Sequence, residues 1–149
     1  MRRWYNGCVK ALALILLAAC GGAQLQTVTV VNRSSRPIQE LYVYPVGAAN
    51  HGTSRGSVAP NGQTEIKVKP GNIEVMALSA KLQVDEHTRD QPSASGDLEV
   101  STQRPAQVIF YDDGSTPPPE ASRPGVFGFA FVIPKAAPKP DDDSAGSGS

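Results

Sequence analysis

Residues 27–45 read TVTVVNRSSRPIQELYVYP and contain the clearest β signal of the chain. Every side chain in residues 27–31 is β-branched, which suits an extended strand. Residues 32–37 are polar and end in proline, as turns commonly do. Residues 38–45 then alternate with the two-residue period of a strand. This pattern predicts two β-strands joined by a turn.

Further strands are expected on either side of two strong turn signals. Residues 60–62 are Pro-Asn-Gly and residues 69–72 are Lys-Pro-Gly-Asn, both typical of tight turns. A short strand is expected over residues 56–59, and alternating strands over residues 64–68 and 73–78. Three strands joined by two such turns predict an antiparallel meander.

The remaining strands are spaced more widely. Residues 81–84 either extend the preceding strand or start another, and residues 85–96 are polar enough to predict a loop. Short strands are expected over residues 98–100 and 106–111. Residues 126–133 alternate aromatic or large side chains with small ones. We expect the aromatic side of this last strand to face the core, and its Gly and Ala side to lie against a loop or a partner.

These segments together predict an all-β fold. No stretch after residue 24 shows a convincing 3.6-residue apolar period. About seven or eight short strands favour an antiparallel β-sandwich of the immunoglobulin or transthyretin type, with a small β-barrel as the alternative. The sandwich domain is expected over residues 25–134. Residues 135–149 hold no large apolar side chain and are therefore expected to be a disordered tail.

The beginning of the chain carries an apolar segment with basic residues before it. Arg2, Arg3 and Lys10 precede the nine consecutive apolar residues 11–19. A transmembrane helix needs about twenty apolar residues, so this run is too short to span a bilayer. Its length and its basic flank are typical of a signal peptide.

The sequence Leu17-Ala18-Ala19-Cys20 resembles the lipobox of bacterial lipoproteins, in which a branched apolar residue and two small ones precede a cysteine. The resemblance implies cleavage between Ala19 and Cys20, so that residues 1–19 are a lipoprotein signal peptide. It also implies acylation of Cys20, with residues 20–24 as lipid anchor and short linker. Two or more acyl chains anchor a protein stably, because each buried CH₂ contributes ~0.8 kcal/mol.

The same resemblance bears on location. A lipid on Cys20 tethers the domain to a membrane face outside the cytoplasm, in the cell envelope. Gly21 stands where an Asp often means inner-membrane retention in diderm bacteria, so the periplasmic face of the outer membrane is favoured. The alternative is an ordinary signal peptide, cut near Gly21 or Ala23, which leaves a secreted protein.

Three short pieces in the middle of the chain are similar to the small β-sandwich domains of bacterial envelope lipoproteins. They are the polar turn at residues 32–35, the Leu-Tyr-Val-Tyr-Pro strand end at residues 41–45, and the Ala-Pro-Asn-Gly hairpin at residues 59–62. This resemblance implies an envelope sandwich and carries over no functional residue.

Charge and cysteine content exclude two classes of protein. Removing residues 1–19 takes away three of the 14 basic residues and none of the 14 acidic ones, which leaves a net charge of −3. A mildly acidic domain lacks the electrostatic footprint of a nucleic-acid-binding protein. Cys20 is then the single remaining cysteine and is used by the lipid, which excludes a disulfide framework.

Residues suited to chemistry are sparse. The two histidines, His51 and His87, each stand alone in a polar segment, without the spacing of metal ligands or of a catalytic triad. We therefore expect no catalytic residue, no metal and no cofactor. Asp112 and Asp113 open the most ligand-like loop, Asp-Asp-Gly-Ser-Thr, which suits either Ca²⁺ binding or an Asx turn at a strand end.

Aromatic residues offer a second kind of candidate contact. Tyr42 and Tyr44 lie on one side of their predicted strand, with Leu41 and Val43 on the other, and either side is apolar enough to face the core. Exposed tyrosines on a sheet face could stack on a sugar or anchor a protein partner. The alternative is that such side chains belong to the core or cover an edge of the sheet.

The function expected from the sequence is that of a membrane-anchored envelope lipoprotein. It would be held by lipid on Cys20 and would act as a non-enzymatic protein-binding or assembly module. A carbohydrate- or peptidoglycan-binding module is the alternative, and a hydrolase is a weaker third. The loops at residues 46–55, 85–96 and 112–125 are the expected partner contacts.

Overall fold

The structure is a computed structural model that describes residues 22–133 and residue 135. The expected signal peptide, Cys20 and nearly all of the predicted tail lie outside the described residues. The described residues form nine β-strands and one 3₁₀ helix. These elements are β1 (Gln26–Asn32), β2 (Ile38–Pro45), β3 (Gln63–Val68), β4 (Gly71–Ser79), β5 (Leu82–Gln83), β6 (Arg89–Asp90), β7 (Ser93–Val100), β8 (Ala106–Asp112), η1 (Pro119–Ser122) and β9 (Val126–Phe131).

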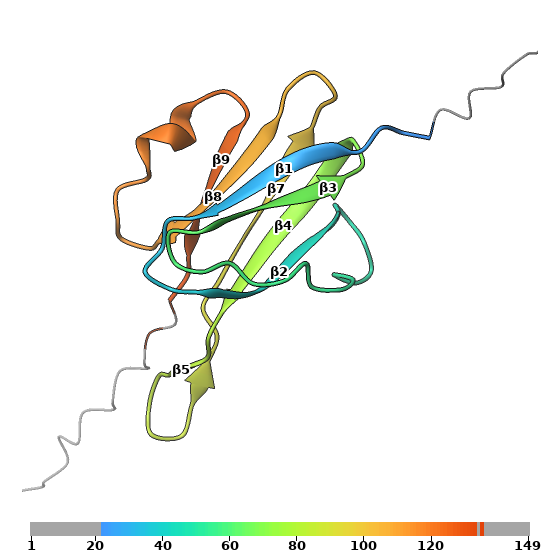
Figure 1. Ribbon diagram of the computed structural model, residues 1–149. Helices are drawn as coiled ribbons and strands as arrows, with labels where there is room; N and C mark the ends of the chain where they lie inside the picture. The colour runs from blue at the N-terminus through green and yellow to red at the C-terminus, as the bar shows by residue number, and fades with distance from the viewer. Residues whose placement is uncertain (1–21, 134, 136–149) are drawn as a thin grey trace, which may run out of the picture.

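The long strands form two sheets that pack face to face (Figure 1). One sheet has the strand order β3-β1-β8-β9 and the other has the order β2-β4-β7, while β5 and β6 pair only with each other. In the part of the chain that the structure describes, neither sheet closes into a barrel. The predicted all-β sandwich is thus confirmed, in preference to the barrel alternative.

The four-stranded sheet is mixed, whereas the sequence predicted antiparallel pairing. Strand β1 is antiparallel to β3 but parallel to β8, and β8 is parallel to β9. Parallel neighbours cannot be joined by a tight turn and need a crossover of about a dozen residues or more. Residues 113–125, which include η1, form that crossover between β8 and β9. The long connection between the last two strands therefore has a topological role.

The predicted meander is wrong, because β3 and β4 lie in different sheets. Strand β3 pairs with β1, and β4 pairs with β2 and β7. Residues 56–59 contribute one bridge, between Val58 and Ile38, in place of a strand. The turn at Lys69 and Pro70 takes the chain from one sheet to the other. Turn residues show that a chain changes direction, but they do not show in which sheet its continuation pairs.

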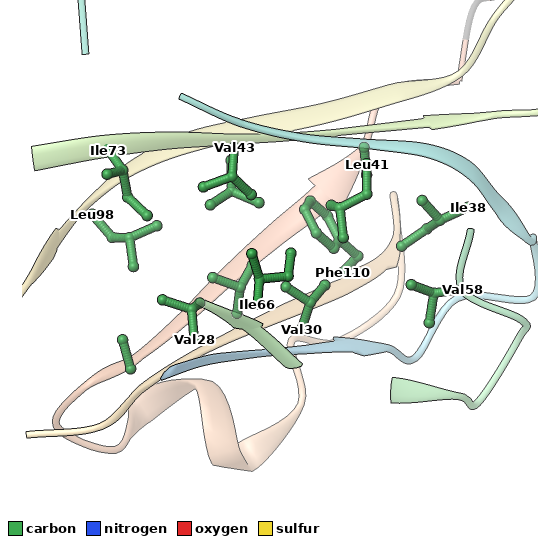
Figure 2. Close-up of a cluster of buried hydrophobic side chains, with 14 of the residues drawn as sticks. Val28, Val30, Ile38, Leu41, Val43, Val58, Ile66, Ile73, Leu98 and Phe110 are labelled. Atoms are coloured by element: carbon green, nitrogen blue, oxygen red, sulfur yellow. The ribbon is translucent and has the colours of Figure 1, made fainter. Parts of the chain in front are cut away.

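The core is a layer of aliphatic and aromatic side chains between the sheets (Figure 2). Leu41 and Val43 point into it from β2, opposite Val30 and Phe110 from the other sheet. The aromatic side of β9 also faces inward as predicted, with Phe131 fully buried. Burial of such side chains stabilises the fold by about 1.5–3 kcal/mol each, which makes this layer the main source of stability.

A buried polar network fixes the turn between β1 and β2. The amide nitrogen of Asn32, which is 0% exposed, donates to the carbonyl oxygens of Arg36, Val58 and Ala59 at 2.7, 3.2 and 3.3 Å. Its Oδ1 accepts from the backbone N–H and the hydroxyl of Ser34. The predicted polar turn is thus held by one asparagine whose polar atoms are all satisfied.

The two ends of the sandwich are distinct. Gln26 at the start of β1 pairs with Val68, and only two residues separate Val68 from Gly71 at the start of β4. Strand β4 runs from there to Ser79, where the β5–β6 hairpin begins (Figure 1). We call the end that contains Gln26 the N-terminal end, and the end that carries the hairpin the distal end.

Candidate functional site

The loop at residues 46–55 packs against the sandwich. The backbone N–H of Arg55 donates to the carbonyl of Leu41 at 2.6 Å, and the Leu41 N–H donates to the hydroxyl of Ser54 at 3.3 Å. These bonds place the loop along the outer edge of β2. His51 from the same loop lies over the ring of Tyr44, with ring centroids 4.8 Å apart. The loop therefore covers part of the sheet, although its residues other than Ser54 are exposed.

The two candidate tyrosines do not form an open platform. Tyr44 is only 8% exposed, and burial followed by the nearby Glu74 carboxylate raises its pKa to about 12. Tyr42 is half-buried, and its hydroxyl donates to Glu40, which raises the pKa of Tyr42. The structure brings both tyrosines next to His51, a contact that the sequence pattern did not predict. Flat stacking of a sugar needs a more exposed pair of rings.

The crossover at residues 113–125 also packs on the sandwich. A Cβ placed on Gly128 of β9 would lie 3.0 Å from the Cβ of Ala121 in η1 and 3.2 Å from Cε1 of Tyr111. The small side of β9 therefore accommodates η1, which agrees with the expectation that a loop covers it. The crossover is a structural cover for the outer face of the sheet.

Asp112 has a structural role at the end of β8. Its Oδ2 accepts from the backbone N–H of Ser35 at 2.9 Å, which ties the β1–β2 turn to β8. Its carbonyl oxygen accepts from the backbone N–H of Ser115 at 3.2 Å and from the Ser115 hydroxyl at 2.6 Å. Asp113 beside it is exposed. These bonds favour the turn interpretation of this loop over a calcium site.

Residues 80–92 differ from the other two predicted contact loops because they project from the distal end (Figure 1). Strands β5 and β6 pair through Leu82 opposite Asp90 and Gln83 opposite Arg89. The hairpin thus replaces the first part of the loop predicted over residues 85–96, and β7 starts already at Ser93. Two-residue strands are too short to show an alternating pattern in the sequence.

The tip of this hairpin is organised by one carboxylate. Oδ1 of Asp85 accepts from the backbone N–H groups of His87 and Thr88 at 2.9 and 2.8 Å. These hydrogen bonds, led by the one from His87, lower the pKa of Asp85 below its ordinary value. Glu86 and His87 are exposed at the tip. The tip therefore presents an ordered, mostly acidic surface.

The base of the hairpin is attached to the sandwich by a few hydrogen bonds. The backbone N–H of Ser79 donates to the carbonyl of Pro92 at 2.9 Å, and the side chain of Gln91 donates to the Ser79 carbonyl at 2.8 Å. Farther out, Nε of Arg89 donates to Oε1 of Gln83 at 2.9 Å. An isolated two-stranded hairpin is at best marginally stable in water. The hydrogen bonds at its tip and at its base therefore hold this exposed hairpin on the sandwich.

The two histidines among the described residues lie in different parts of the fold. His51 packs on tyrosine rings, and His87 lies at the hairpin tip at the distal end. Among residues 22–133 and 135, no group of three or more His, Cys, Asp or Glu side chains could hold a metal ion. The expectation of a non-enzymatic protein remains a prediction.

Comparison of the chain with models of protein families, with curated proteins and with solved structures gives no match. Within the described part of the chain, no helix combines the length and the apolar character that crossing a membrane requires.

Proposed function

We propose that this protein is a lipid-anchored lipoprotein of the cell envelope and acts as a non-enzymatic protein-binding or assembly module. Lipid on Cys20 would hold the sandwich at the membrane, at the periplasmic face of the outer membrane in a diderm cell. The hairpin at residues 80–92 would be its contact with an envelope protein.

The observation that carries this proposal is the position of the hairpin. It projects from the distal end, whereas the chain enters the sandwich at the opposite end, where β1 begins at Gln26 (Figure 1). Only residues 21–25 separate Cys20 from β1, and such a segment reaches about 17 Å when extended. An anchor at Cys20 would thus keep the N-terminal end near the bilayer and point the hairpin away from it.

Two other features support a contact with protein. The hairpin tip is polar and ordered by its own hydrogen bonds, so it can present Glu86 and His87 without exposing a core. The other two candidate loops are attached to the sheets at a few positions, through Ser54 and Arg55 on β2 and through Ala121 on β9. A carbohydrate- or peptidoglycan-binding role has weaker support, because the ring of Tyr44 is nearly covered.

The test is an affinity pull-down from native membranes after chemical cross-linking, with mass spectrometry of bait and prey. We expect an acyl mass on Cys20 in the wild type, its loss in Cys20→Ser, and specific envelope proteins among the cross-linked prey. The double variant Glu86→Arg/His87→Ala should lose those proteins and keep the acyl group. Its matched control is Glu65→Arg, an equally exposed charge reversal on β3.

Two outcomes contradict the proposal. A non-acylated wild type, with unchanged fractionation in Cys20→Ser, would mean that the protein is secreted without an anchor. Prey that the hairpin variant and the control retain equally would remove the hairpin as the contact. Retention of the wild type on purified cell-wall material, without protein prey, would instead support the carbohydrate alternative.

A further inference from the structure

The N-terminal end of the sandwich exposes apolar side chains. Among the described residues, the exposed large hydrophobic side chains are Leu25, Val46 and Val132, which are 51%, 46% and 66% exposed. Leu25 directly precedes β1, and the backbone N–H of Val46 donates to the carbonyl of Asn72 near the start of β4. Two of these three side chains therefore lie at the same end of the sandwich.

An open hollow of about 470 Å³ lies beside Leu25 at this end. Its wall includes the apolar side chains of Val68 and Ile73, whereas Lys67 and Lys69 lie at its border. Both lysines are exposed. The combination is an apolar hollow with a basic rim.

The loops at the N-terminal end carry positive charge only. Residues 46–49, 69–70, 101–105 and 123–125 contain Lys69, Arg104 and Arg123 and no acidic residue. A second hollow, lined by the 102–105 segment together with Gln26 and Thr27, places Arg104 beside the start of β1.

Acidic residues adjoin this end as well. Asp97 and Glu99 line the hollow that includes Val46, and Glu99 lines another hollow together with Arg104. Like Glu74, they alternate along their strand with core residues and so lie on the outer face of the three-stranded sheet.

At the distal end, the hairpin at residues 80–92 contains three acidic residues, Asp85, Glu86 and Asp90, against the two basic residues Lys81 and Arg89, which gives it a net charge of −1. The loops of the N-terminal end are thus basic, whereas the hairpin is close to neutral.

We propose that the N-terminal end is a docking surface for an anionic phospholipid bilayer. Leu25 and Val46 would enter the interface, and Lys67, Lys69 and Arg104 would meet lipid phosphates. Anionic bilayers attract basic groups near their surface, and amphipathic surfaces bury apolar side chains at the headgroup boundary. The attraction falls off over about 8–10 Å at physiological salt, so it acts only when the end lies close to the membrane.

This inference rests on the proposed lipid anchor for its orientation, and it adds a second attachment. The linker of residues 21–24 is short enough to hold the basic end within reach of the headgroups. With an anchor alone, the domain would be free to tumble on its linker. With docking, one end would stay on the bilayer, and the hairpin would be held at a fixed height.

The experiment places a single tryptophan reporter at each end. The only tryptophan of the chain, Trp4, lies in the expected signal peptide, so the mature protein has no tryptophan emission of its own when it is excited at wavelengths that tyrosine does not absorb. The acylated mature protein carrying Val46→Trp would be reconstituted into phosphatidylcholine vesicles with or without about 30% phosphatidylglycerol. Val132→Trp is the matched control, because it is more exposed and lies after β9, next to Ser93 at the distal end of β7.

We expect a blue shift of the Val46→Trp emission, and its quenching by brominated lipid, in the anionic vesicles. Both effects should weaken several-fold in 0.5 M salt, because salt screens the phosphate contacts. They should also weaken several-fold in Lys69→Glu/Arg104→Glu. The distal charge reversal Lys81→Glu/Arg89→Glu should retain them, and Val132→Trp should remain unshifted throughout.

The outcomes separate this inference from the proposed function. An acylated protein whose Val46→Trp emission is the same in both vesicle types would overturn the docking surface and leave the lipoprotein proposal intact. A non-acylated protein that still shows the salt-sensitive shift when mixed with anionic vesicles would support docking and overturn the anchor. A concentration-dependent shift without vesicles would mean that a second copy covers this end.

Discussion

The ring of Phe129 occupies the space above Gly96 that a side chain would need. A Cβ built on Gly96 would lie 2.0 Å from Cε1 of Phe129, so the two residues fit only because one of them is glycine. The contact joins β9 of the four-stranded sheet to β7 of the three-stranded sheet. Close by, the Val132 N–H donates to the Ser93 carbonyl at 2.8 Å. Together these contacts close one side of the sandwich.

Gly96→Ala should destabilise the protein by about 1–3 kcal/mol, because the ring of Phe129 must move out of a packed core. Urea denaturation followed by circular dichroism measures the change. Ser95→Ala, on the exposed face of the same strand, should change the free energy of unfolding by less than about 0.5 kcal/mol. The double variant Gly96→Ala/Phe129→Leu should lose less free energy of unfolding than the two single variants lose together, because the smaller side chain leaves room for the new methyl group. If the losses simply add, the steric explanation fails.

Asn32→Asp should be among the most damaging single substitutions. It replaces an amide that donates to three carbonyl oxygens with a carboxylate that faces them, inside a fully buried site. We expect a loss of about 3 kcal/mol or more in the free energy of unfolding at neutral pH. Thermal unfolding of the variant measures it. Asn72→Asp, at an exposed position on β4, is the matched control and should change little.

The hairpin tip should loosen in acid. The hydrogen bonds from His87 and Thr88 depress the pKa of Asp85 in the folded protein. The ionised Asp85 carboxylate therefore stabilises the folded tip above pH 3.8, its ordinary pKa. This stabilisation is lost as the pH falls through the lower pKa of the folded state. Amide chemical shifts of His87 and Thr88 should follow this titration in NMR spectra. In Asp85→Asn, which keeps the acceptor oxygen, the same shifts should not move below pH 4.

Tyr44 should make the fold weaken at high pH. Its folded pKa of about 12 is raised above the ordinary value of 10.0, so the folded state retains a proton that the unfolded state releases. Stability is thus fully present below pH 10 and declines as the pH rises toward 12. Absorbance titration of tyrosinate should show a late-ionising group that disappears in Tyr44→Phe. If the late ionisation persists in Tyr44→Phe and disappears in Tyr42→Phe, it belongs to Tyr42, whose pKa is also raised, and the prediction for Tyr44 fails.

Local patterns predicted the faces of the strands well. The β-branched run of β1 is a strand, and Phe131 on the aromatic side of β9 is fully buried. Alternation is a property of neighbouring residues, so it can be read from the sequence. Alternation did not show which face of β2 points toward the core, because both faces are apolar. In the structure, Leu41 and Val43 pack in the core.

The pairing between strands was harder to predict from the sequence, because it depends on contacts between residues that are far apart along the chain. The start of β7 was missed because Ser95 and Gly96 are not residues that favour strands. The glycine at position 96 is needed because the ring of Phe129, 33 residues later in the sequence, fills the space of a side chain there. The sequence did not predict the packing of His51 on Tyr44 or the hydrogen bond from Ser35 to Asp112, because these contacts also join residues that are separated along the chain. The candidate hairpin was not predicted as such: residues 81–84 were expected to extend a strand or start another, and residues 85–96 were expected to be a loop.

The parallel pairing of β1 with β8 has a consequence for how the chain acquires its structure. Val28 meets Ala106, so the centre of the four-stranded sheet cannot form until most of the domain is available. Contacts between such distant segments require closure of a large loop before they stabilise anything, which slows folding. A chain delivered from its N-terminus would thus remain without its central strand pair until β8 had emerged. If the chain is exported as proposed, such a delay would keep it unfolded until β8 had crossed the membrane.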